Sequence, residues 1–87
     1  MSTSNKTITP GDWQLISTGP STRLGALQRV SGHGEFMVAC ATDVPQDDLI
    51  GHFPEGKEII NFALDEGEYL YGRLRATSSN SLLVVTE

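Results

Sequence analysis

The chain has 87 residues, a formal net charge of −5 and a single cysteine. A chain of this length forms one domain, and domains this small often depend on a disulfide, a metal or a partner for part of their stability. One cysteine excludes an internal disulfide, and six Lys and Arg against eleven Asp and Glu argue against nucleic acid as the partner.

The first eleven residues, MSTSNKTITPG, are polar and show no hydrophobic periodicity. This composition is typical of a flexible arm at the end of a domain. We therefore expect an extended N-terminal arm at 1–11, held by a neighbouring subunit when it is ordered, and a single domain at 12–87. The arm lacks the apolar run of a signal peptide, and no stretch of the chain is long and apolar enough to span a membrane.

The first half of the domain predicts three strands, at 12–18, 23–30 and 35–42. The first has on one face Trp13, Leu15 and Ser17. The second ends at the turn SGHG, whose two glycines adopt positive φ without steric cost. The third has on one face Phe36, Val38 and Cys40. Its other face carries small residues, which indicates that this face is covered as well.

The second half contains a long connection at 43–57, followed by strands expected at 58–64, 68–76 and 81–86. Four Pro and Gly residues exclude a long helix or strand from the connection. No part of the chain shows the 3.6-residue apolar period of a helix. The sequence thus predicts an all-β fold, a small antiparallel β-sandwich or barrel of about six to eight strands.

Reactive side chains show no spacing typical of catalysis or metal binding. Cys40 lies in an apolar alternation and is interpreted as a small buried residue. His33, in a glycine turn, is expected to be exposed, and it lies far from His52 in the sequence. The acidic residues of the connection indicate a solvated loop, with a weak divalent-ion site or a docking patch for a basic partner as alternatives; they are Asp43, Asp47, Asp48 and Glu55. We expect no enzymatic activity, no cofactor and no metal.

A row of Tyr and Arg side chains on the strand at 68–76 is the most specific candidate for partner binding. Its members are Tyr69, Tyr71, Arg73 and Arg75. Tyr and Arg are enriched at the centres of protein interfaces, although the row is equally consistent with an ordinary outward sheet face. Further predicted contacts are His52 and Phe53 in the connection and Ser2, Thr3, Thr7 and Thr9 in the arm. Trp13 is expected in the core.

Two segments carry a resemblance to a known class of proteins. They are WQLISTGPSTRLGALQRVSGHGEFMVACATDVP and GHFPEGKEIINFALDEGEYLYGRLRATSSNSLLVVTE, in which GEYLYGR precedes the terminal strand. From Trp13 to Glu87 this pattern resembles small β-sandwich virion proteins of tailed bacteriophages. The resemblance implies a structural subunit without a catalytic motif, commonly a homo-oligomer such as a trimer, and located in the virion after synthesis in the host cytoplasm.

The function expected from this resemblance is capsid decoration, in which the protein binds and stabilises the shell of the major capsid protein. A head–tail, tail or fibre-anchoring subunit is the first alternative. A receptor- or carbohydrate-binding module is the second, and it would require an exposed aromatic platform.

Overall fold

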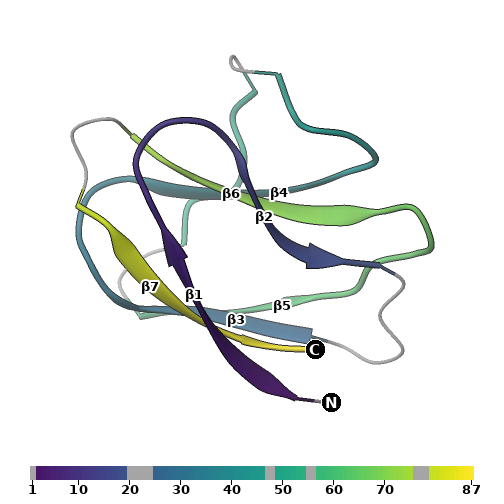
Figure 1. Cartoon of the computed structure of the whole chain (residues 1–87), viewed down its shortest axis with the longest axis horizontal. Helices are drawn as coiled ribbons and strands as arrows, with labels where there is room; N and C mark the ends of the chain where they lie inside the picture. The colour runs from purple at the N-terminus through teal and green to yellow at the C-terminus, as the bar shows by residue number, and fades with distance from the viewer. Residues whose placement is uncertain (1, 20–24, 47–48, 55–56, 76–78) are drawn as a thin grey trace.

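The computed structural model of the chain describes residues 2–19, 25–46, 49–54, 57–75 and 79–87. Within these ranges the chain forms antiparallel strands in two sheets, one above the other in Figure 1. The strands are β1 (Thr3–Ile8), β2 (Gln14–Thr18), β3 (Gly25–Ser31), β4 (Phe36–Ala41), β5 (Ile59–Phe62), β6 (Tyr69–Leu74) and β7 (Ser81–Thr86). One sheet has the order β1-β7-β3-β5 and the other β2-β6-β4.

The all-β prediction is confirmed, and the two separate sheets make the fold a sandwich rather than a barrel. Six of the strands coincide with the segments in which apolar and polar residues alternate. Residues 23, 24 and 76, at the ends of two predicted strands, lie outside the described residues. The described part of the chain contains no helix that could cross a membrane.

The segment predicted as an N-terminal arm is instead strand β1 at the edge of the larger sheet. It pairs with β7 along its whole length, from Thr3 opposite Thr86 to Ile8 opposite Ser81. Only Ile8 of this strand is fully buried. An edge strand held mainly by backbone hydrogen bonds needs no hydrophobic alternation, so its sequence resembles that of a flexible segment. The element that holds it is β7 of the same chain, and the predicted boundary at residue 11 does not separate two parts of the fold.

The main core lies between the sheets and is formed by the inward side chains of both. Within a strand these residues follow the two-residue period, as Leu70 and Leu74 do in β6 and Leu83 and Val85 in β7. The cluster consists of Ile8, Ile16, Leu27, Phe36, Val38, Phe62, Leu64, Leu70, Leu74, Leu83 and Val85.

A β-bulge in β2 changes which of its side chains reach this core. Leu15 pairs with Tyr71 and Ser17 with Leu70, so Ile16 is an extra residue between them. Ile16 and Ser17 are therefore both buried, while Leu15 is 42 % exposed. The prediction that Leu15 and Ser17 share a face is wrong, because a bulge interrupts the two-residue alternation of a strand.

Candidate functional site

A second apolar cluster covers the outer face of the three-stranded sheet. It consists of Trp13, Met37, Ala39 and Tyr71, with Ala41 and Tyr69 packed against it. The predictions that Trp13 is a core residue and that the second face of β4 is covered are thereby confirmed. This face is covered because the connection between β4 and β5 packs on it, as the contacts of that connection show.

The Tyr and Arg row belongs largely to this cluster rather than to a free surface. Tyr71 is only 7 % exposed, so its side chain is not available to a partner in this conformation. Tyr69 is half-buried, with its ring centroid 6.2 Å from that of Tyr71. Burial, followed by the negative charge of Asp43 and the neighbouring Tyr69, raises the pKa of Tyr71. The prediction of Tyr71 as a contact residue is corrected, because Trp13 and the connection cover the strand face on which it lies.

The two arginines of the row are engaged within the chain. Arg73 Nε donates a hydrogen bond of 2.9 Å to the carbonyl oxygen of Gly11, and its guanidinium lies over the ring of Trp13, 6.0 Å from the centroid. Arg75 is exposed and forms an ion pair with Glu35. Arg75 is thus the member of the row with the most exposed side chain, and Arg73 helps to hold Trp13 on the sheet.

The connection between β4 and β5 is fixed to the sheet at two points. Val38 and His52 exchange backbone hydrogen bonds of 2.9 Å in both directions. Trp13 Nε1 donates a hydrogen bond of 3.3 Å to the carbonyl oxygen of Gln46. The Leu49 amide donates a hydrogen bond of 3.0 Å to the same carbonyl oxygen. These contacts hold Gln46, Leu49 and His52 in place, although the described part of the connection contains no strand or helix.

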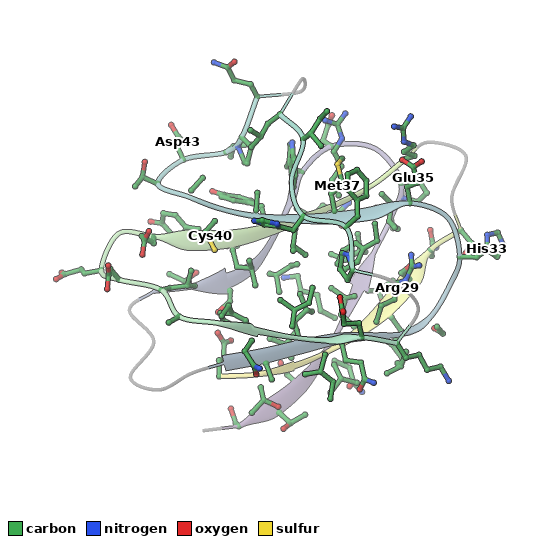
Figure 2. All side chains as sticks on the ribbon, turned by 180° about the vertical axis from the view of Figure 1, so that it is seen from behind. Arg29, His33, Glu35, Met37, Cys40 and Asp43 are labelled. Carbon is green, nitrogen blue, oxygen red and sulfur yellow. The ribbon has the colours of Figure 1, made fainter. Side chains whose placement is uncertain are left out.

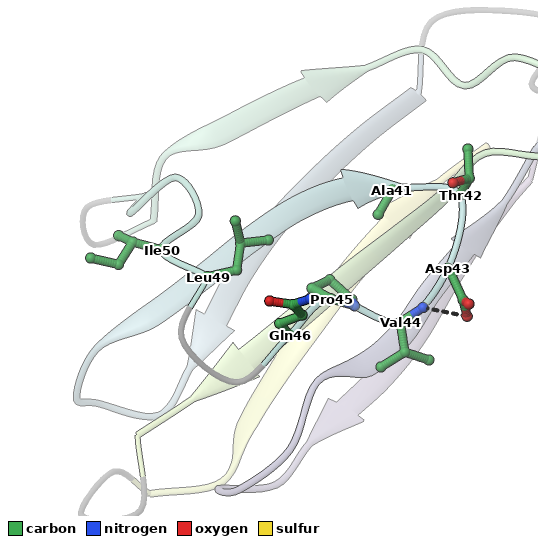
Figure 3. A pocket seen from close by; sticks show the side chains of 8 residues that line it. All are labelled: Ala41, Thr42, Asp43, Val44, Pro45, Gln46, Leu49 and Ile50. Carbon is green, nitrogen blue, oxygen red and sulfur yellow. Dashed lines mark hydrogen bonds between the residues drawn. The ribbon is translucent and has the colours of Figure 1, made fainter.

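Four large apolar side chains of this connection point into solvent. Val44 is 60 % exposed, Leu49 42 %, Ile50 75 % and Phe53 46 %. We refer to these four residues as the loop surface. Three of them line an open hollow of about 640 Å³, together with Ala41, Thr42, Asp43, Pro45 and Gln46. Figure 3 shows Leu49 and Ile50 on one side of this hollow and Val44 on the other.

Of the loop surface, the sequence interpretation identified only Phe53, together with its neighbour His52. Val44, Leu49 and Ile50 were missed because apolar residues in a segment rich in Pro and Gly have no periodicity from which to read their orientation. The signal that was available is that this segment contains more large apolar residues than a solvated acidic loop needs. The side chain of His52 is exposed, and the backbone of His52 pairs with that of Val38.

Cys40 is exposed, which contradicts its interpretation as a buried residue. It lies at the end of edge strand β4 near Asp43, as Figure 2 shows, where no further strand of the described chain closes the space between the sheets. A cavity of about 230 Å³ opens there, lined by Cys40 and His52 and by residues of β5 such as Ile60. Although the residue is exposed, partial burial of the thiol and, secondarily, the charge of Glu68 raise the pKa of Cys40. A raised thiol pKa lowers the fraction of reactive thiolate.

The predicted contacts in the arm lie on or beside β1. Ser2 and Thr3 are exposed, and Thr3 Oγ1 forms a hydrogen bond of 2.8 Å with Thr86 Oγ1. Thr7 is exposed on the strand, while the backbone of Thr9 is bound by the side chain of Gln14. Ser2, Thr3 and Thr7 lie along the β1 edge of the four-stranded sheet, whereas the loop surface lies beside the three-stranded sheet. Thr9 lies where the chain passes from one sheet to the other, since Gln14 of β2 binds its backbone. The sequence therefore combined two separate surfaces into one set of contacts.

Among the residues that the structure describes, no three His, Cys, Asp or Glu side chains are grouped as a metal site would require. His33 is exposed, as expected, and lies at the opposite end of the sandwich from Cys40 (Figure 2). Comparison with known proteins found no matching family model, curated protein or solved structure. The exposed loop surface is therefore the feature on which a functional proposal can be based.

Proposed function

We propose that this protein is a non-enzymatic structural subunit of a tailed-bacteriophage virion, a decoration protein that binds the shell of the major capsid protein through the loop surface. The observation that carries the proposal is the exposure of Val44, Leu49, Ile50 and Phe53 on a connection that is fixed to the sheet at Gln46 and His52. The resemblance of the chain from Trp13 to Glu87 to small virion proteins supplies the kind of partner.

The energetics of burial support a docking role for this surface. Complete burial of a Leu, Ile or Phe side chain contributes about 1.5–3 kcal/mol. The four side chains of the loop surface are between 42 % and 75 % exposed, so together they offer a partner the burial of about two complete side chains. Because the connection is already fixed by Trp13 and by the Val38–His52 pairing, little conformational entropy is lost when it binds. Many copies on one shell add avidity without further contacts.

Charge supports a partner with basic groups around an apolar patch. Asp43 lines the hollow beside the loop surface, and Asp47, Asp48 and Glu55 lie in the same connection of the sequence. The chain as a whole carries a net charge of −5. Complementary charge at the rim of an interface speeds association and selects among partners more than it adds affinity.

The alternative virion positions, at the tail, the head–tail joint or a fibre attachment, would use the same loop surface. No feature of the described chain favours them over the shell. A carbohydrate-binding module receives less support, because of the two tyrosines that would form its aromatic platform Tyr71 is buried and Tyr69 is half-buried.

Binding to capsids tests the proposal with a matched pair of variants. Leu49 on the loop surface and Leu15 on β2 are both 42 % exposed, and β2 and β4 are opposite edges of their sheet. We expect Leu49→Ala, alone and combined with Ile50→Ala, to reduce co-sedimentation with capsids that lack the protein. Leu15→Ala should bind as the unmodified protein does. Equal binding of all the variants would contradict a docking role for the loop surface.

A further inference from the structure

Both outer edges of the four-stranded sheet present backbone groups that no described strand pairs. At the β1 edge, Ser2 and Glu87 exchange two backbone hydrogen bonds, of 2.8 and 3.0 Å. In an antiparallel ladder the residues that bond to one neighbour alternate with those that point away from it. Ser4, Lys6 and Ile8 therefore bond to β7. The N–H and C=O groups of Thr3, Asn5 and Thr7 point away from the sheet.

The open part of this edge ends at Thr9. The Gln14 side chain accepts a hydrogen bond from the Thr9 amide at 3.2 Å and donates one to the Thr9 carbonyl oxygen at 3.1 Å. A side-chain amide thus occupies the position that the backbone of another strand would take. This contact shows the direction in which the edge is open and leaves three residues, Thr3, Asn5 and Thr7, available for pairing.

The same alternation identifies the open groups of β5 at the other edge. In β7, the backbone groups that do not bond to β1 point toward β3. Val84 is one of these residues, and it lies opposite Gln28 of β3, so the two form a hydrogen-bonded pair. Leu27 then faces β5 and bonds to Ile60. Ile59 and Asn61 consequently point their backbone groups outward, and both residues are exposed, Ile59 by 59 %.

The start of β5 is held from the inner side of the sheet by a glutamine of β3. Gln28 Nε2 donates a hydrogen bond of 2.8 Å to the carbonyl oxygen of Lys57, just before the strand begins. This contact leaves the outward groups of Ile59 and Asn61 unpaired, so both edges of the sheet are open over short stretches.

The charges on the two edges are opposite and complementary. Lys6 lies on the inward side of β1 and is half-buried, and an inward charge on an edge strand disfavours pairing with an apolar edge. Glu58 is exposed immediately before β5. Within the described residues neither Lys6 nor Glu58 has an ion-pair partner. A partner strand with an acidic residue opposite Lys6 would compensate the inward charge of Lys6. This charge therefore favours an acidic partner strand and disfavours an apolar one.

We propose that the four-stranded sheet continues from one copy of this chain into the next, with the β1 edge of one copy paired antiparallel to the β5 edge of a second copy. In the register that places Asn5 opposite Ile59 and Thr3 opposite Asn61, Lys6 lies directly opposite Glu58. That pair is not hydrogen-bonded through its backbones, and such pairs bring side chains closest. The contact joins the β1 edge of one copy to the β5 edge of the next, which leaves each copy a second edge for a further copy. Repetition of the contact therefore gives a ring or a filament. This inference is independent of the capsid partner proposed above.

Proline substitution tests the β1 edge without breaking the sheet inside one copy. The Asn5 amide points away from β7, so Asn5→Pro removes an outward donor and leaves the β1–β7 hydrogen bonds in place. We expect the purified protein to self-associate in sedimentation velocity, and Asn5→Pro to be a folded monomer. Asn5→Ala, which keeps the amide, should associate as the unmodified protein does. Asn61→Pro makes the same test at the other edge if Asn5→Pro does not fold.

Charge reversal tests the register. Lys6→Glu or Glu58→Lys alone should raise the dissociation constant of the oligomer about tenfold, and the double variant should restore it, because the pair is then present with its signs exchanged. A chain that remains monomeric at every concentration would overturn the proposal. An oligomer that is indifferent to both proline variants and to the charge reversals would overturn it as well.

Discussion

Val38 and His52 exchange two backbone hydrogen bonds of 2.9 Å, and this pair fixes the long connection to the outer edge of β4. Val38 belongs to the main core, where it is 4 % exposed. A residue of an irregular segment is thereby fixed to a strand whose side chains form part of the core. The pairing with Val38 fixes the backbone at His52. The nearby side chains of Ile50 and Phe53 remain exposed in this arrangement.

Gly51→Ala should destabilise the protein, because a Cβ at Gly51 would collide with the carbonyl oxygen of Val38 and lie 3.3 Å from the ring of Trp13. The collision is with backbone, so the connection must shift, and we expect a loss of about 1–3 kcal/mol in urea denaturation. Ile50→Ala is the control, since Ile50 is 75 % exposed and should change stability by less than about 0.5 kcal/mol. Equal stability of Gly51→Ala and the unmodified protein would contradict the close packing of the connection on β4.

Trp13→Phe should loosen the connection at its other anchor. Phe keeps part of the apolar bulk but cannot donate the hydrogen bond to Gln46, which is worth about 0.5–1.5 kcal/mol. Hydrogen exchange of the Leu49 amide, which donates to the same carbonyl oxygen, should accelerate more than exchange in the core strand β7. Unchanged exchange at Leu49 would show that Trp13 does not hold the connection.

Tyr71→Ala and Phe53→Ala should have opposite effects, although the sequence alone predicts both as partner contacts. Tyr71 is 7 % exposed in the outer cluster, and truncation of a buried aromatic side chain costs about 3–5 kcal/mol. Phe53 is 46 % exposed, so Phe53→Ala should retain most of the stability and lose partner binding. Thermal unfolding followed by circular dichroism separates the two variants. A larger loss of stability in Phe53→Ala would reverse their assignment to surface and core.

Cys40 should react with a thiol reagent such as DTNB more slowly than an exposed cysteine with an ordinary pKa. Burial and the charge of Glu68 raise its pKa, so less thiolate is present at any pH below that pKa. Glu68→Gln removes the smaller of the two causes, lowers the thiol pKa and should increase the reaction rate near pH 8 by a few fold. The rates should converge at high pH, where both thiols are ionised. A rate near pH 8 that is unchanged or lower in Glu68→Gln would contradict this account.

Sequence alternation predicted the strands well, and its failures have specific physical causes. Strand β6 follows a strict two-residue period, which puts Leu70 and Leu74 on one face, and the structure shows that this face is the core side. Alternation fails in β2, where the bulge at Ile16 places two successive residues inward. It also fails for Cys40, which has the inward orientation of β4 but lies at an open edge. The exposure of that residue depends on which strand is its neighbour, and strand order is not encoded in a local pattern.

The candidate site was harder to predict than the fold. The row of Tyr and Arg was correctly placed on the outward face of β6, yet this face is covered by a connection that is distant in sequence. Contacts such as Trp13 with Gln46 depend on tertiary packing, which no local period reports. The apolar residues of the loop surface lie where periodicity carries no information, so only the structure shows their exposure.

The copy number of this protein in purified virions, measured against the major capsid protein by quantitative mass spectrometry, tests the central claim most directly. A decoration protein on the shell should be present at one copy per capsid subunit or at a simple fraction of that number. A few dozen copies or fewer per particle would place it at the tail or its attachments instead, and its absence from virions would contradict the proposed structural function.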